Sequence, residues 1–355
     1  MQFLDFGDGH NGSPAVAGVV NSYATCTGSS GSTTLTTTLA VSAGDMILIH
    51  QTYGAGAGHW EVNFVISDNG ATITLGHPLS YSYATGAQAV IIPQFIGGTI
   101  SGAQTCTAWN GSIGGIIAIA SSGALTISGS LTVSGQGFRG GTSTTGDHPN
   151  WSGDGSAALT AQTRDPAGNA GGGGEKRSGS QGTGGGGGGN GTSGANGQAG
   201  GVAANWPGVG GDADGNAALT DMVMGGGGGG GSNENTILGG DGGGIILVIA
   251  KTLTVTGSLV SAGANGANNS PGTDKGGAGG GAGGSILVKA QIATLGTNKL
   301  TAPAGAGATE YWDGGNGGVG RIRCDYYSSK TGSSTPTLSS GQDTNLKKAV
   351  HTGMV

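Results

Sequence analysis

The placement of glycine constrains this chain more than any other feature of its sequence. Glycine occupies 84 of the 355 positions, and 28 of the 61 residues from 171 to 231 are glycine. Ordering a glycine costs about 0.5–1 kcal/mol more than ordering an alanine, so fixing these 28 residues costs on the order of 15–30 kcal/mol. A whole domain has a net stability of only about 5–15 kcal/mol. The segment can therefore be ordered only if its own backbone packs closely and forms hydrogen bonds.

The glycine-rich segment also has a period of three. Gly191, Gly194, Gly197 and Gly200 are three residues apart, which is the repeat of the left-handed polyproline II helix. Chains in this conformation have no internal hydrogen bonds, and without Cβ atoms neighbouring chains come close enough to bond to one another. Collagen is excluded because the chain has only 9 prolines. We expect ordered polyglycine II-like passes, with mobile glycine loops as the alternative.

A longer repeat surrounds these glycines. Four segments begin with Gly-Gly and continue into an apolar run, at residues 114–135, 243–263, 283–296 and 317–327. Units of this kind bury their faces only by stacking on one another. A long insert, residues 140–242, separates the first copy from the second. The sequence therefore predicts an all-β fold, with a glycine-rich β-solenoid and polyglycine II-like helical passes over residues 111–328.

Residues 1–110 predict an N-terminal β domain. Short runs rich in Val, Ile and Thr alternate with Gly, Asn and Asp, and they predict strands at residues 33–41, 46–52, 60–67, 71–75 and 89–95. Asp68-Asn69-Gly70 lies between two of these runs and predicts a type I′ hairpin turn. At the other end, residues 329–355 are rich in Ser, Thr and Gly and are expected to form a polar tail that serves as a linker or attachment.

Charge and hydropathy argue against several functional classes. The chain has 13 basic and 19 acidic residues and no basic cluster, so we expect no nucleic-acid partner. No apolar stretch is long enough for a membrane span, and the first residues lack the regions of a secretory signal peptide. Cys26, Cys106 and Cys324 are too few and too far apart for a disulfide framework or a metal site. We expect buried free thiols, with a Cys26–Cys106 bridge as the alternative.

The acidic residues offer little for catalysis. Enzymes that cleave polysaccharides need two carboxylates at a fixed separation, but most Asp residues lie beside Gly in contexts typical of turns. Asp212, Asp214 and Asn216 form the densest cluster of oxygen ligands and would suit Ca²⁺, although Asp-Gly is also ordinary turn chemistry. None of the histidines has a partner at a ligand-like spacing. We therefore expect no enzymatic activity and no cofactor, with Ca²⁺ as the alternative.

Aromatic residues in polar loops are the best candidates for recognition. Each candidate lies beside a glycine-rich stretch; they are His148, Trp151, Trp206, Tyr311 and Trp312. Aromatic side chains with polar neighbours supply both contact area and hydrogen bonds. We expect these residues to bind a bacterial surface glycan or an outer-membrane protein. The alternative is that each Trp caps the end of a glycine lattice.

Glycine runs broken by polar or aromatic loops, over residues 140–320, resemble the glycine-rich tip adhesins of the long tail fibres of T-even-like bacteriophages. This resemblance of composition and organisation implies a non-enzymatic virion fibre or adhesin component, extracellular on the virion, with other fibre proteins or further copies of itself as partners. The alternative is a structural subunit of an extracellular filament or surface layer on a bacterial or archaeal cell. Thr at period two, in residues 34–38 and 252–256, is typical of ice-binding proteins, but the other repeats lack this ladder.

Overall fold

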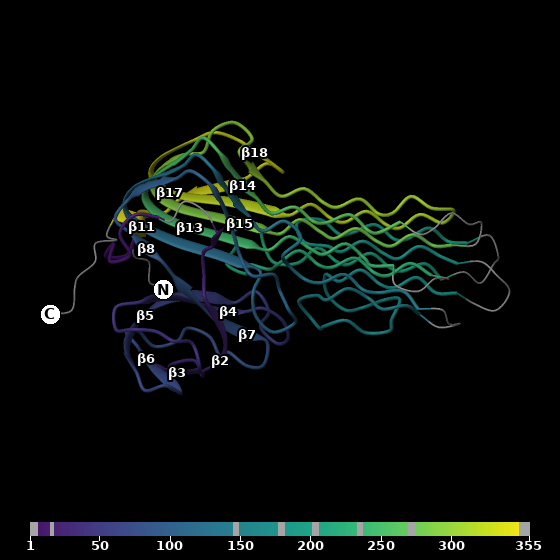
Figure 1. Ribbon diagram of the computed structural model, residues 1–355, viewed down its shortest axis with the longest axis horizontal. Coiled ribbons are helices and arrows are strands. Elements are labelled where there is room, and N and C mark those ends of the chain that lie inside the picture. Colours follow the sequence, from purple (N-terminus) through teal and green to yellow (C-terminus); the bar gives the residue numbers. More distant parts are fainter. Residues whose placement is uncertain are drawn as a thin grey trace.

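The structure is a computed structural model that describes residues 6–14, 18–144, 149–176, 182–200, 206–232, 237–268 and 275–347. The fold is all-β, as the sequence predicts, and the one helical element among these residues is the short 3-10 helix η1 (Thr344–Lys347). Figure 1 shows three parts: a barrel, a pair of sheets beside it, and a long bundle of extended chain that projects from the sheets.

The barrel closes in the strand order β2-β3-β6-β5-β4-β7. Its strands are β2 (Tyr23–Thr27), β3 (Thr34–Thr37), β4 (Met46–Gln51), β5 (Trp60–Asp68), β6 (Thr72–Leu75) and β7 (Ala87–Ile92). Burial alternates along β2 and β3, as it does in strands with one face in a core. The strands expected from the sequence are confirmed, and β2 is an additional one.

The turn between β5 and β6 differs from the expected type. The two strands form the predicted hairpin, and Gly70 has a φ of 89°. A type I′ turn needs positive φ at both central residues, but Asn69 is not among the described residues with positive φ. Instead, the Asn69 side chain accepts a hydrogen bond of 2.9 Å from the Thr72 amide. This side-chain bond holds a longer turn that needs only one left-handed residue.

The strands of the four sequence repeats lie in two parallel sheets. Sheet A has the order β19-β17-β15-β13-β11-β8, with β9 also paired to β11, and sheet B has the order β1-β10-β12-β14-β16-β18. The strands of sheet A are β8 (Gln94–Phe95), β9 (Gly98–Ile100), β11 (Ile116–Ile127), β13 (Ile245–Val255), β15 (Ser285–Thr294), β17 (Arg321–Thr331) and β19 (Ser339–Gln342). Those of sheet B are β1 (Gly18–Val19), β10 (Ala103–Thr105), β12 (Ser130–Thr132), β14 (Ser258–Val260), β16 (Leu300–Thr301) and β18 (Ser334–Thr335).

The register of sheet A aligns the four repeats. Ile116 pairs with Ile245, Ile245 with Ser285, and Ser285 with Arg321. The insert between the first two copies therefore leaves the pairing of their apolar runs unchanged.

Sheet A is buried on both faces, which explains its continuous apolar runs. On one face, Ile246 packs in a core with Leu259 of sheet B. On the other face, Ile245 packs in a core with Met46 and Leu48 of the barrel. The barrel is thus held against the sheet by apolar contact.

Residues 329–342, expected to be a polar tail, belong to the sheets. They include the end of β17, and β18 and β19, which pair in parallel with the strands before them. Each of these two strands lies at the edge of its sheet. A polar segment can take this place because pairing uses main-chain groups and an edge strand needs little apolar surface.

The rest of the glycine-rich chain forms a bundle of extended passes that we call the glycine bundle (Figure 1). Its passes are residues 137–144, 149–155, 168–176, 182–191, 192–200, 206–215, 222–232, 237–244, 262–268, 275–284, 302–308 and 312–320.

Hydrogen bonds between the passes repeat every three residues. In the pass 182–191, Gly185 and Gly188 donate to the pass 275–284, and Gly186 and Gly189 donate to the pass 168–176. The intervening amides of Gly184 and Gly187 donate to the pass 192–200. Carbonyls of the pass accept from three other passes, 206–215, 222–232 and 312–320, so this pass has hydrogen-bonded neighbours on six sides.

Close approach explains why the centre of the bundle is glycine. A Cβ on Gly186 would lie 2.1 Å from the carbonyl oxygen of Val209, far inside van der Waals contact. The passes 222–232 and 275–284 also have neighbours on six sides. These three central passes are the ones richest in glycine.

Outer passes need glycine only where they face inward. In the pass 192–200, a Cβ on Gly194 or Gly197 would lie 2.1 or 2.0 Å from a carbonyl oxygen of the central pass. Asn196 lies between them and is exposed. The spacing of three in the sequence therefore coincides with the inward positions of an outer pass.

Candidate recognition site at the end of the glycine bundle

Four of the five candidate residues lie at the end of the glycine bundle that is farthest from the sheets. The pass 275–284 runs directly into β15, so its first residues are at this far end. There, Gly277 donates a hydrogen bond of 2.8 Å to the carbonyl oxygen of Trp312. Trp206 begins another pass at the same end, and Trp151 lies near the start of a third. His148 lies outside the described residues.

Main-chain bonds tie each Trp to the bundle. The amide of Gly230 donates to the carbonyl of Trp151 at 3.0 Å, and the amide of Glu175 donates to that of Trp206 at 3.1 Å. Gly174 joins these two sites because its amide donates to Gly230 at 2.9 Å. The glycine backbone thus sets the positions of the aromatic residues relative to one another.

Trp206 forms one half of a cation-π pair. The guanidinium carbon of Arg164 lies 4.3 Å from the centroid of the Trp206 ring. The hydroxyl of Thr183 also donates to the Trp206 carbonyl at 3.0 Å. A guanidinium stacked on an indole offers a flat surface with hydrogen-bond donors at its edge. Such a surface suits a ligand that is partly apolar and partly polar.

Tyr311 and Trp312 form a second aromatic group. Their rings meet edge to face, with centroids 4.9 Å apart and an interplanar angle of 87°. Tyr311 is 56% exposed, whereas the buried indole Nε1 of Trp312 has no hydrogen-bond partner among the described residues. The pair therefore combines a tyrosine exposed to solvent with a buried donor that has no partner among the described residues.

Two further residues at this end were not anticipated from the sequence. Arg164 carries no signal, because it is a single cation in a polar segment. Leu238 is 52% exposed and is held by a bridge to Thr142. A single apolar residue among glycines has no periodicity from which its exposure could be predicted.

Asp214, from the acidic cluster considered for Ca²⁺, is engaged in contacts with the protein. The carboxylate of Asp214 accepts a short hydrogen bond from the Ser156 hydroxyl, and the Asp214 carbonyl accepts one of 2.9 Å from Arg321. Across the described residues, no group of three or more His, Cys, Asp or Glu side chains is placed to hold a metal ion.

The cysteines are free and buried, as expected. Burial raises the pKa of each of the thiols of Cys26, Cys106 and Cys324 to about 12. They therefore stay protonated at neutral pH, which makes them poor nucleophiles and poor metal ligands.

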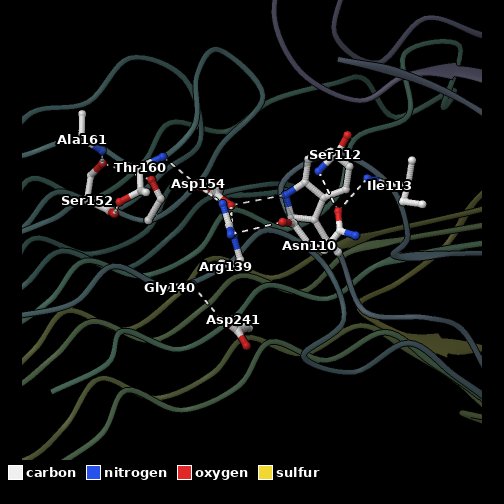
Figure 2. A network of polar contacts seen from close by, with 12 residues as sticks. Asn110, Ser112, Ile113, Arg139, Gly140, Ser152, Asp154, Thr160, Ala161 and Asp241 are labelled. Atoms are coloured by element: carbon white, nitrogen blue, oxygen red, sulfur yellow. Dashed lines mark hydrogen bonds and ion pairs between the residues drawn. The ribbon is translucent and has the colours of Figure 1, made fainter. Parts of the chain in front are cut away.

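Figure 2 shows the polar network where the first pass meets the chain after the barrel. Arg139 lies between Asp154, at 2.7 Å, and the carbonyl of Asn110, at 3.2 Å. The indole of Trp109 also donates to Asp154, at 3.3 Å, so this fully buried carboxylate is saturated with donors. Nearby, burial raises the pKa of Asp241, which accepts a hydrogen bond from the Gly140 amide. The network fastens the passes to one another and to the chain after the barrel.

No helix in the described residues is long and apolar enough to cross a membrane. No protein-family model matches the chain, and no curated protein is significantly similar to it.

Proposed function

We propose that this chain is a non-enzymatic display protein, a bacteriophage virion fibre or adhesin component that recognises a bacterial surface receptor. The observation that carries the proposal is the location of Trp151, Trp206, Tyr311 and Trp312, all at the far end of the glycine bundle. Aromatic residues from loops far apart in sequence lie at the same end of a common backbone scaffold. Recognition surfaces are typically built around such aromatic and Arg anchors.

The glycine bundle acts in this proposal as a rigid stalk. Its hydrogen bonds repeat every three residues and its central passes have neighbours on six sides, which supports a polyglycine II-like lattice. The parallel sheets at its base follow the sequence repeats and support a β-solenoid. At about 3.1 Å per residue, a pass such as 182–191 spans roughly 30 Å. The stalk would hold the aromatic end well clear of the barrel.

The chemistry of the far end favours a surface glycan or an outer-membrane protein as receptor. Arg164 over Trp206 combines an aromatic face with donors, and exposed Tyr311 adds a hydroxyl. Exposed Leu238 adds apolar area. An amphipathic ligand matches this mixture better than a highly charged one does.

A filament or surface-layer subunit is the second candidate, because β18 and β19 lie at open sheet edges. The sides of the glycine bundle argue against a filament in which the bundle of one copy forms main-chain hydrogen bonds with the bundle of the next. There, side-chain oxygens accept hydrogen bonds from amides that face outward. The Asn196 side chain accepts one of 2.8 Å from the Gly210 amide, and the Asn316 side chain accepts one of 2.8 Å from the Gly307 amide. Donors that are paired in this way are not available to another copy.

Binding to bacterial cells tests the proposal. Fluorescently labelled protein should bind cells of at least one strain in a diverse panel, and Trp151→Ala combined with Trp206→Ala should abolish that binding. Tyr81→Ala, which removes an aromatic side chain from the barrel, is the control and should bind normally. Polymerisation of the purified protein, unaffected by the double substitution, would favour the filament instead. Release of oligosaccharides from bacterial polysaccharide would overturn the non-enzymatic proposal.

A further inference from the structure

The outer surface of the barrel contains a groove of about 500 Å³ that is separate from the bundle end. Its floor is formed by outward-facing residues of β2 and β3, and its walls by the segments around Tyr53, Ala84–Ala87 and the β5–β6 turn. The volume is within the range of about 300–1,000 Å³ that is typical of small-molecule sites.

Threonine hydroxyls cover the floor of the groove. Cys26 pairs with Thr37 and Thr27 with Thr36 across β2 and β3, and this register sets Thr25 opposite Thr38. The side chains of Thr25, Thr27, Thr36 and Thr38 are exposed. In the described part of the chain their hydroxyls form no hydrogen bond with the protein. Each can therefore both donate to and accept from a ligand.

One aromatic ring lies along the wall. Tyr53 packs edge to face with Trp109, at a centroid distance of 6.1 Å and an angle of 72°, and this contact helps to hold the Tyr53 ring in place. Gly86 has a φ of 96°, and a Cβ at this position would lie 2.9 Å from the Tyr53 ring. Glycine at position 86 thus lets the ring lie close to the backbone at the groove wall.

No lining residue carries a charge. An ionic ligand would lose hydration in the groove without gaining a counter-charge. Because the barrel is closed, β2 and β3 also have no free edge to pair with a peptide strand. A concave floor walled by a tyrosine differs from the flat, repeated array that ice binding requires.

We propose that this groove binds a neutral saccharide, with hydroxyls of the sugar bonded to Thr27 and Thr36 and an apolar face of the sugar ring against Tyr53. Paired hydroxyls beside one aromatic ring supply the two kinds of contact that a neutral sugar needs. The site is independent of the proposed recognition at the bundle end, since the two share no residue.

Methyl NMR of the full chain, labelled at threonine methyl groups, tests the groove directly. The probes are glucose, galactose, mannose and N-acetylglucosamine and their disaccharides at millimolar concentrations. At least one should shift the methyl signals of Thr27 and Thr36 in a saturable way. Absence of such shifts with every probe would overturn the proposal, as would shifts confined to the threonines of the glycine bundle.

Variants separate binding from folding. Tyr53→Ala and Thr36→Val should each weaken the saccharide affinity about tenfold or more, whereas Tyr53→Phe should keep most of it. Thr34→Val is the matched control, because Thr34 is an exposed threonine of the same strand that does not line the groove. Trp206→Ala should leave the affinity unchanged. Equal affinity in the native chain and in a Thr36→Val variant with an unchanged melting temperature would contradict the assignment.

Discussion

His50 of the barrel donates a hydrogen bond of 2.7 Å from its Nε2 to the main-chain carbonyl of Met222, at the start of a central glycine pass. The carbonyl can only accept, so Nε2 carries the proton and Nδ1 is an acceptor. Thr52 lies 3.0 Å from Nδ1, and its own oxygen accepts from Gln88 at 2.9 Å. This chain of bonds holds a fully buried histidine in its neutral form, between the barrel and the bundle.

Stability should therefore fall on acidification. Burial lowers the pKa of His50 from 6.5 to about 4. Above pH 6.5 both the folded and the unfolded chain have a neutral imidazole. Between pH 6.5 and 4 only the unfolded chain binds the proton, so the free energy of unfolding decreases as the pH falls, by about 3 kcal/mol in total at 1.36 kcal/mol per pH unit. Urea denaturation across this range measures the decrease.

Substitution of single histidines tests whether His50 causes this fall in the free energy of unfolding. His50→Gln should lower stability at pH 7 and remove most of the slope between pH 6.5 and 4. His77→Gln, on the exposed surface, should keep the slope of the native chain. If both variants retain the same slope, the neutral His50 is not its source.

A single methyl group at the centre of the bundle should be costly. Gly187→Ala would bring a Cβ to 2.0 Å from the carbonyl oxygen of Asn316, which neighbouring passes hold in place. We expect a loss of about 3 kcal/mol in the free energy of unfolding, because overpacking forces the backbone to move. Gly76→Ala is the control, since its Cβ would have no neighbour closer than 3.7 Å. Equal stability of the two variants would show that the passes are not closely packed.

The sequence predicts well what depends on local spacing. Short runs rich in Val, Ile and Thr mark the barrel strands, and the Gly-Gly starts of the repeats mark strands that pair in register, such as Ile116 with Ile245. The spacing of Gly194 and Gly197 marks the inward positions of an outer pass. In each case the signal lies within a short stretch of the chain.

Long-range packing leaves no such signal. Which passes surround residues 182–191 depends on the course of the whole chain, and a glycine has no side chain to specify a partner. The stacking of Arg164 on Trp206 joins residues 42 positions apart in number, and neither has a distinctive local pattern. The polar strand β19 pairs through main-chain groups, which every sequence has.

Amide exchange should reveal the period of three. Gly194, Ala195, Gly197 and Gln198 donate main-chain hydrogen bonds to neighbouring passes, so their amides should exchange slowly. The amide of Asn196 forms no main-chain bond with the described residues and should exchange rapidly. Hydrogen exchange followed by NMR at single-residue resolution measures this contrast. Rapid exchange at all five positions would mean that the pass is not held in the bundle.

Removal of side chains that accept hydrogen bonds from amides at the side of the bundle should promote self-association. Asn316→Ala removes the oxygen that accepts from the Gly307 amide, which leaves a donor at the bundle edge and costs about 1 kcal/mol of stability. Asn265 plays the same part for the Ala306 amide, at 2.9 Å, so the double variant exposes two adjacent donors. In sedimentation velocity, we expect the double variant to form dimers or larger species, with a higher sedimentation coefficient than that of the native chain. Asn268→Ala is the control, because Asn268 is exposed and caps no described amide. An unchanged sedimentation coefficient in the double variant would mean that the paired edge donors are not what limits association.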